Sequence, residues 1–183
     1  MEMRTDGLNL NIGDKAPDFA LQGVDGRIHT LNEFKGKKAL AIVFMCNHCP
    51  YVQGSIERLK ELQSEFAMKG FHIVGINSND DANYPEDSFE KMIELVKSKH
   101  INFPYLRDES QSAAKAYGAQ CTPEVFLFDS HRHLKYHGRI DDSPKDASMA
   151  KVTDLRNAAD AVLHDRKVAI DLAPAIGCSI KWR

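Results

Sequence analysis

The sequence has no long hydrophobic run, no cluster of basic residues and no dense set of cysteines. No segment approaches the roughly 20 apolar residues that a membrane-spanning helix needs, and residues 1–14 lack the apolar core of a secretory signal. The formal net charge is −2, and Lys and Arg are dispersed along the chain, which gives no electrostatic reason to expect nucleic acid or an anionic membrane as a partner. We therefore expect a cytoplasmic protein that binds neither.

The chain also lacks internal repeats and low-complexity segments. Its 183 residues are 43% hydrophobic, which suits one globular domain with a substantial core and leaves little room for a second. We expect a single domain over residues 1–183 that ends in a tail over residues 167–183. The tail shows no periodicity but holds one of the four cysteines and the only tryptophan, so it is either frayed or docked. We expect Trp182 to anchor it on apolar surface.

The most informative segment is Cys46-Asn47-His48-Cys49-Pro50. It follows the apolar run 39–45, which predicts a buried central strand, and it precedes a helical pattern. In a reducing compartment, a Cys-x-x-Cys pair is more often catalytic or metal-binding than structural. The position of this pair, where a strand gives way to a helix, favours redox chemistry.

Hydrophobic periodicity predicts an α/β domain. Residues 38–76 form a strand, a helix closed by Gly70 and a second strand, so the crossover should be right-handed and the two strands parallel. Antiparallel hairpins are predicted at residues 16–31 and 125–137, so the sheet should be mixed. Further helices are predicted at residues 89–100, between a cap at Asp108 or Ser110 and Gly118, and between Pro144 and His164.

This order of elements, with a Cys-x-x-Cys after the first core strand, resembles the thioredoxin fold. The segments Gly13–Phe19 and Asp25–Arg27, with Leu31 and Gly36-Lys37, are similar to the entry segment of the redoxin branch, which includes the alkyl hydroperoxide reductase/thiol-specific antioxidant proteins and thioredoxin-like thiol reductases. The resemblance covers roughly residues 11–140. It implies a thioredoxin-like fold, in which helices flank a central mixed sheet and a β-hairpin extends the N-terminus.

The Cys-x-x-Cys pair meets the two needs of thiol–disulfide exchange, which are an attacking thiolate and a second thiol that expels the bound partner. We expect Cys46 to attack and Cys49 to resolve. Unpaired N–H groups and the dipole at the start of the helix favour a thiolate there. His48, when protonated, adds a positive charge and lowers the pKa of the attacking thiol further.

Thr122-Pro123-Glu124 is expected to face the pair. The resemblance implies a cis proline at Pro123, with Thr122 offering backbone hydrogen bonds to an extended substrate; a trans proline that opens a strand is the alternative. Glu124 completes a Pro-Glu-x-Phe pattern that resembles redoxin-like thiol reductases. It either accepts the proton released by the resolving thiol or lies on the surface at the sheet edge.

The two remaining thiols have open roles. Cys121 is either a third redox thiol near the pair or a small buried filler. Cys178 acts as a resolving or partner thiol only if the tail folds back over the site. A zinc site at the pair would need two more ligands from Cys121, Cys178, His131 and His133. None of these forms a second Cys-x-x-Cys, so we expect no metal and no cofactor.

The sequence therefore predicts a thiol:disulfide oxidoreductase that acts on a protein or small-molecule disulfide or thiol and uses an electron donor. With Asn-His between the cysteines, it should be more oxidising than thioredoxin. A peroxiredoxin-like peroxidase is the alternative, although with that family's cysteine aligned on Cys49, Ile42 and Cys46 replace its proline and threonine. A copper-assembly redoxin module is a third candidate, weakened because such proteins have Cys-x-x-x-Cys-Pro, one residue more than here.

Overall fold

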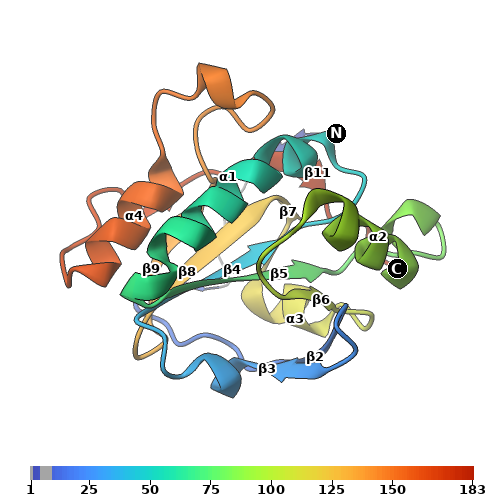
Figure 1. Cartoon of the computed structure of the whole chain (residues 1–183), viewed down its shortest axis with the longest axis horizontal. Coiled ribbons are helices and arrows are strands. Elements are labelled where there is room, and N and C mark those ends of the chain that lie inside the picture. The colour runs from blue at the N-terminus through green and yellow to red at the C-terminus, as the bar shows by residue number, and fades with distance from the viewer. Residues whose placement is uncertain (1, 5–9) are drawn as a thin grey trace.

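The computed structural model describes residues 2–4 and 10–183, and an eight-stranded mixed sheet organises them (Figure 1). Its strands lie in the order β10-β9-β8-β4-β5-β6-β2-β3. In the middle, β4 pairs in parallel with β5 and antiparallel with β8. The predicted thioredoxin-like fold is confirmed, including the N-terminal hairpin β2–β3, which joins the sheet through β6. The strands are β2 (Ala20–Gly23), β3 (Ile28–Thr30), β4 (Ala39–Phe44), β5 (Phe71–Asn77), β6 (Tyr105–Arg107), β8 (Glu124–Asp129), β9 (Leu134–Gly138) and β10 (Leu172–Ala173).

Helices cover both faces of the sheet. The first face carries α1 (Pro50–Phe66), α2 (Phe89–Lys99) and α4 (Asp154–Leu163), and the second carries the short α3 (Ser112–Tyr117). Among the residues described, no helix is both long and apolar enough to cross a bilayer. In the described part of the chain, four 3-10 helices complete the set: η1 (Leu31–Phe34), η2 (Ala67–Lys69), η3 (Pro85–Asp87) and η4 (Ala147–Met149).

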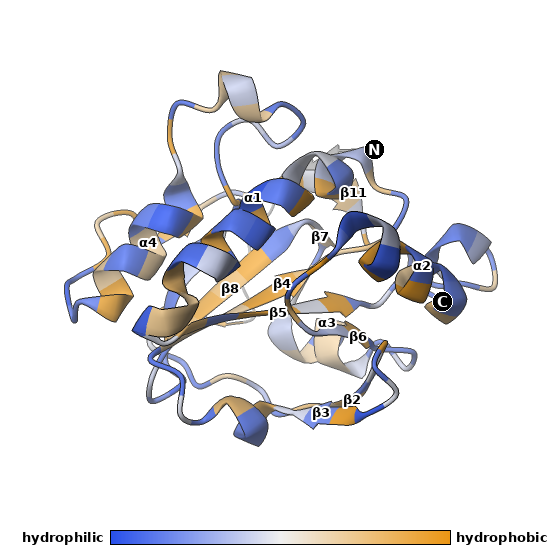
Figure 2. Ribbon diagram, in the orientation of Figure 1, coloured by the Kyte–Doolittle hydropathy of each residue, from blue (hydrophilic) through white to orange (hydrophobic). Residues whose placement is uncertain are grey.

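Strand β4 is apolar along its whole length because both of its faces are covered. Val43 packs into the cluster under α1, while Ile42 and Phe44 pack into the cluster on the opposite face. All six residues of β4 are fully buried, and Figure 2 shows β4 and β8 in the colour of hydrophobic residues. A central strand in a covered sheet shows this continuous run instead of an alternating pattern.

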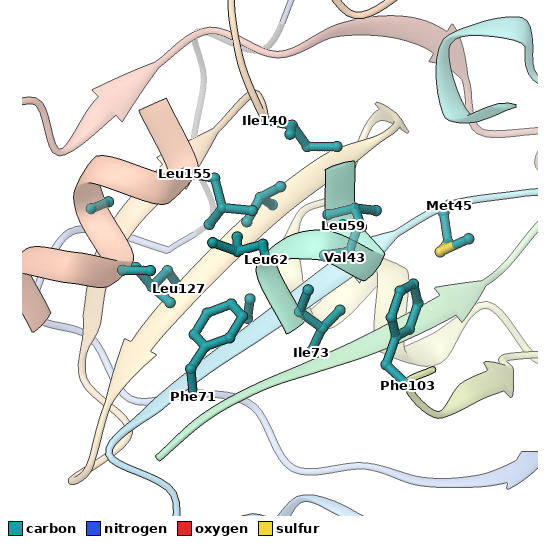
Figure 3. Packing of buried hydrophobic residues seen from close by; sticks show 14 of the residues in the cluster. Val43, Met45, Leu59, Leu62, Phe71, Ile73, Phe103, Leu127, Ile140 and Leu155 are labelled. Atoms are coloured by element: carbon teal, nitrogen blue, oxygen red, sulfur yellow. The ribbon is translucent and has the colours of Figure 1, made fainter. Parts of the chain in front are cut away.

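The core under α1 fixes the beginning of that helix relative to the end of β4. Leu59 and Leu62 of α1 lie over Val43 and Ile73 of the sheet (Figure 3). Burying a large apolar side chain contributes roughly 1.5–3 kcal/mol. The apolar stripe predicted for this helix therefore holds the segment between β4 and α1 in place, and Gly70 follows with φ of 96°, in the left-handed conformation expected of a helix end.

The C-terminal tail is docked. Strand β11 (Ile176–Ser179) lies between β1 (Glu2–Arg4) and β7 (Cys121–Thr122) in a separate three-stranded sheet. Ile180 anchors the segment after β11, with 3% of its surface exposed. The role expected for Trp182 is wrong, because Trp182 is 44% exposed and lies under the ammonium group of Lys115 at 5.9 Å.

The last helix is shorter than predicted. The apolar stripe of Leu155, Ala159 and Val162 continues to Val152 in the sequence, which predicts an earlier start. The helix nevertheless begins at Asp154, and Val152 is 38% exposed. The preceding segment bends over α1 because the Arg58 guanidinium donates to the backbone carbonyls of Ser143 at 2.9 Å and Pro144 at 3.0 Å.

The short helix α3 begins after Gln111, and both predicted caps serve it: the Ser110 hydroxyl accepts a hydrogen bond from the backbone N–H of Ser112 at 3.3 Å. The Asp108 carboxylate accepts hydrogen bonds from the backbone N–H groups of Ala113 at 3.3 Å and Ala114 at 2.9 Å. A carboxylate that satisfies the first N–H groups of a helix stabilises its start.

Candidate active site

The two cysteines of the motif lie where β4 leads into α1. Strand β4 ends at Phe44, and Cys49 is the N-cap of α1, with Pro50 at the first helical position. A proline is tolerated there because the first helical N–H groups have no partner within the helix. Cys46 and Cys49 both have 0% exposure. In this conformation the two thiols face each other inside the protein.

A buried carboxylate, Asp87 of η3, holds the two residues between the cysteines. Its Oδ1 accepts hydrogen bonds from the backbone N–H groups of Asn47 at 2.7 Å and His48 at 3.2 Å. Its Oδ2 lies 2.6 Å from Nδ1 of His48 and accepts from Nδ2 of Asn79 at 2.7 Å. The hydroxyl of Tyr105 donates to Oδ1 of Asn47 at 3.0 Å. Hydrogen bonds to a buried charge are strong, so Asp87 fixes the backbone of the motif.

The cis proline loop closes the site. The Thr122–Pro123 peptide bond is cis, as predicted. Thr122 touches both thiols: its Oγ1 lies 3.4 Å from Sγ of Cys46, and its carbonyl oxygen accepts a hydrogen bond from the Cys49 thiol at 3.3 Å. Strands β7 and β8, on either side of Pro123, therefore place this loop directly against the pair.

The two thiols differ in their affinity for a proton. Hydrogen bonding to Cys49, burial and the negative charge of Asp87 raise the pKa of Cys46 well above its usual value. The pKa of Cys49 is lowered to about 5, chiefly because the Cys46 thiol donates to its sulfur. Burial opposes this shift, but the Cys178 thiol and the backbone N–H groups of Val52 and Cys178 add to it. When it is protonated, the Cys49 thiol donates to the carbonyl oxygen of Thr122, and the hydrogen bond from Cys46 favours the loss of that proton.

This proton order is opposite to the one expected from the sequence. The helix start does favour a thiolate, but at its N-cap, Cys49, and not at Cys46, which precedes the helix. The expected effect of His48 on Cys46 stays a prediction. The His48 ring is directed at Asp87 and stacks on Tyr84, with ring centroids 6.0 Å apart, and the adjacent Asp87 charge raises the pKa of Cys46.

Cys46, His48 and Asp87 also form a group of potential metal ligands, whose donor atoms lie within 4.8 Å of one another. Both oxygens of Asp87 are already engaged in hydrogen bonds with the motif and with Asn79. These bonds account for the arrangement without an ion. Within the described residues, this group does not include the further zinc ligands considered from the sequence, which are Cys121, Cys178, His131 and His133. That the site holds no metal stays a prediction.

Glu124 is buried beside the site and paired with His137. Its Oε1 lies 2.6 Å from Nε2 of His137. Its Oε2 accepts hydrogen bonds from the backbone N–H groups of Gln120 at 2.7 Å and Cys121 at 3.1 Å. A surface position for Glu124 is wrong, because its exposure is 0%. The carboxylate supports the segment before Pro123, and its role as a proton acceptor stays a prediction.

The two other thiols occupy different environments. Cys121 is fully buried, and burial raises its pKa, which suits a packing role. Cys178 lies in β11 and is only partly buried, and its pKa is raised to about 11, chiefly by burial. The backbone of Cys178 is paired with that of Thr122. The tail thus does fold back over the site, as a role for Cys178 requires.

The sequence did not single out Asp87 or the pairing of β11. Asp87 lies in a loop whose only visible feature was its polarity, but a signal existed: this loop follows β5, which is parallel to β4. The carboxyl ends of adjacent parallel strands meet at one sheet edge, so an acid after β5 can reach the residues after β4. No local sequence pattern indicates that β11 pairs with β7.

Comparison with known proteins settles the family. Residues 11–157 match the family model described as Redoxin. The chain belongs to the redoxin family. One relative of this redoxin, the thiol-disulfide oxidoreductase ResA of Geobacillus thermodenitrificans, is 27% identical over 124 residues, which are 68% of this chain and 67% of that protein. Another, the putative peroxiredoxin bcp of Haemophilus influenzae, is 26% identical over 109 residues, which are 60% of this chain and 65% of that protein.

A solved structure extends the likeness to the whole redoxin chain. The crystal structure of an uncharacterized conserved protein from Geobacillus kaustophilus is 40% identical, has a TM-score of 0.93, and the match covers 100% of this chain and 97% of that one. The predicted redoxin family and oxidoreductase class are confirmed. The names of the relatives divide between thiol–disulfide exchange and peroxide reduction. The cytoplasmic location stays a prediction.

Proposed function

We propose that this redoxin is a thiol:disulfide oxidoreductase in which Cys46 and Cys49 cycle between a dithiol and a disulfide. The observation that carries the proposal is geometric: both thiols are buried at the start of α1 against the cis proline loop, with Sγ of Cys46 3.4 Å from Oγ1 of Thr122 and Sγ of Cys49 3.3 Å from its carbonyl oxygen. The hydrogen bond from Cys46 also lowers the pKa of Cys49. A thiolate is the form that attacks a disulfide, and an adjacent thiol completes the exchange. The substrate would be a protein or small-molecule disulfide or thiol, with a separate electron donor.

The position of the thiolate revises the order of attack within this proposal. The sequence favoured attack by Cys46 and resolution by Cys49. The proton order supports the reverse, with Cys49 as the attacking thiolate and Cys46 as the thiol that resolves the mixed disulfide. Asp87 favours this assignment because its charge opposes a second thiolate at Cys46.

Equilibration with glutathione buffers of increasing reducing strength tests the exchange. Trypsin releases residues 39–58 as one peptide that contains both Cys46 and Cys49, so mass spectrometry can measure its dithiol and disulfide forms directly. We expect full interconversion at a midpoint less negative than thioredoxin's value of about −270 mV. Cys46→Ser and Cys49→Ser, as matched controls, should each lose the internal disulfide. If no internal disulfide forms in any buffer, the protein is not a dithiol oxidoreductase of this type.

Peroxide reduction is the second candidate, and the thiolate of Cys49 is the observation that favours it. The peroxiredoxin cysteine aligns on Cys49, but Ile42 and Cys46 stand where that family has the proline and threonine that activate peroxide. We therefore expect slow reaction with hydrogen peroxide, at the rate of an ordinary free thiol. A rapid loss of the Cys49 thiol in stopped-flow measurements would instead assign peroxidase activity.

A further inference from the structure

The C-terminal tail occupies the place expected for a substrate. Strand β11 pairs antiparallel with β7, with Cys178 opposite Thr122 and Ser179 opposite Cys121. Figure 1 shows β11 and β7 next to the beginning of α1, where the redox pair lies. Extended peptides bind by adding a strand to such an edge. Because β11 already fills this edge, the segment that meets the redox pair is part of the chain itself.

Docking of β11 is built into the chain on both sides of Cys178. Before it, Gly177 approaches the cis proline loop so closely that a Cβ atom there would lie 2.1 Å from the carbonyl oxygen of Thr122. Only a residue without a side chain fits at this distance. After it, the backbone N–H of Ile180 donates to the carbonyl oxygen of Gln120 at 2.9 Å. Cys178 is therefore held at a defined position against the pair.

Cys178 links the buried pair to solvent. It lies opposite Thr122 in the β7–β11 ladder, and the carbonyl oxygen of Thr122 is 3.3 Å from Sγ of Cys49. Its side chain packs against the buried cluster that includes Cys46 and Cys49. Of the four cysteines, all within the described residues, Cys178 alone is partly exposed, whereas Cys46, Cys49 and Cys121 are buried. An external thiol or disulfide therefore meets the sulfur of Cys178 before it can reach that of Cys49.

We propose that Cys178 is a third redox thiol, which relays electrons between the buried pair and an external thiol or disulfide. This relay rests on the proposed exchange at Cys46 and Cys49. Reduction of the pair starts from the Cys46–Cys49 disulfide, in which the Cys178 thiolate attacks Sγ of Cys49. A Cys49–Cys178 bond forms, the Cys46–Cys49 bond breaks, and Cys46 takes up the proton that Cys178 released.

An external dithiol completes the transfer. Its thiolate attacks the partly exposed sulfur of Cys178, and Cys49 leaves as a thiolate. The second thiol of the reductant then displaces Cys178, which regains a proton, and the reductant is released as a disulfide. Two electrons thus pass from the dithiol to the buried pair.

The leaving groups favour attack at Cys178 over attack at Cys49. In an exchange, the thiol of lower pKa leaves faster. The pKa of Cys49 is lowered to about 5, chiefly by its hydrogen bond from Cys46, whereas that of Cys178 is raised to about 11, chiefly by burial. In the external step, attack at the sulfur of Cys178 therefore expels the better leaving group. The internal step runs against this order, because it needs the Cys178 thiolate and expels Cys46, whose pKa is raised.

Disulfide mapping in a variant that cannot form the Cys46–Cys49 bond tests the relay step. In Cys46→Ser, the thiols of Cys49, Cys121 and Cys178 lie on three separate tryptic peptides, residues 39–58, 116–132 and 168–181. After oxidation with glutathione disulfide, we expect the first and third peptides to be joined and the second to stay free. Adding Gly177→Val, which displaces β11, should abolish the joined peptide. A join between the first and second peptides would identify Cys121 as the third thiol and overturn the proposal.

Reduction kinetics of the oxidised protein by dithiothreitol provide the second test. The loss of the Cys46–Cys49 disulfide, followed by acid quenching and mass spectrometry, should be about tenfold slower or more in Cys178→Ser and unchanged within about twofold in the matched control Cys121→Ala. If Cys178→Ser is reduced as fast as wild type, or faster, β11 merely covers the pair and the relay is wrong. If wild type forms no Cys46–Cys49 disulfide, the proposed function itself fails.

Discussion

Two substitutions at Cys46 can show which sulfur carries the thiolate. The Cys46 thiol is the largest of the influences that lower the pKa of Cys49 to about 5. Serine keeps a hydrogen-bond donor at this position, so Cys46→Ser should retain an ionisation midpoint near that of wild type. Alanine removes the donor, so Cys46→Ala should raise the midpoint. Cys49→Ser should abolish the ionisation at low pH altogether.

The expected effect on the redox potential follows from the ionised fraction. With a pKa of about 5 instead of 9.0, Cys49 is about 99% ionised at pH 7, where an ordinary thiol is about 1% ionised. This ionisation stabilises the reduced pair by about 3 kcal/mol, or about 60 mV for a two-electron couple. Because the reduced form is the one stabilised, the potential becomes less negative. Cys46 contributes almost nothing to the potential at pH 7, because it is protonated at that pH whether its pKa is ordinary or raised.

Ultraviolet absorbance of the thiolate, measured during a pH titration of the reduced protein, gives the midpoint without requiring access to the buried sulfurs. The redox midpoint potential of the Cys46–Cys49 pair gives an independent measure of the pKa of Cys49. It should fall by about 60 mV per pH unit below pH 5, where reduction takes up two protons, and by about 30 mV per unit above pH 5, where it takes up one. The reasoning is refuted if the low midpoint persists in Cys49→Ser and disappears in Cys46→Ser, because the thiolate then belongs to Cys46.

Three further substitutions test the support around the pair. Asp87→Asn should lower the free energy of unfolding in urea by about 3 kcal/mol, because an amide cannot accept all the hydrogen bonds of the buried carboxylate, each worth about 1.5–3 kcal/mol; Glu86→Gln, on its exposed neighbour, should have almost no effect. Glu124→Gln should lower stability by roughly 1–3 kcal/mol and leave the exchange rate of the folded protein unchanged, whereas a tenfold slower exchange would establish proton transfer by Glu124. Leu59→Ala should cost about 2–5 kcal/mol in the same urea assay, whereas Met68→Ala, at a residue that is 97% exposed, should be neutral.

The parts of the fold that the sequence predicts are those fixed by neighbouring residues. The apolar run of β4 and the three- and four-residue spacing in α1 are local patterns, and each of them decides which face of an element is buried. The cis bond at Pro123 was accessible only through the family resemblance. The start of α4 escaped the prediction because the apolar stripe continues to Val152, while Arg58 on α1 holds the preceding carbonyls in a loop.

The parts of the site that escaped prediction depend on contacts between distant segments. The motif itself indicates a redox pair at a helix start, and the structure confirms that placement. It cannot indicate which thiol loses its proton, because that depends on Asp87, which follows β5, and on Cys178, near the chain's end. A carboxylate among many acids and a cysteine in an aperiodic tail carry no local signal of their positions.

These two distant contacts act on the pair in the same direction. Asp87 places a negative charge beside Cys46, which opposes a thiolate there, whereas β11 places a thiol and a backbone N–H beside Cys49, which favour one. The charge is thereby placed on the sulfur that touches Cys178, the partly exposed cysteine. The tail therefore both helps to create the thiolate and limits access to it. A strand that only blocked the site would need no cysteine opposite Thr122 and no glycine that brings this cysteine into contact with the pair.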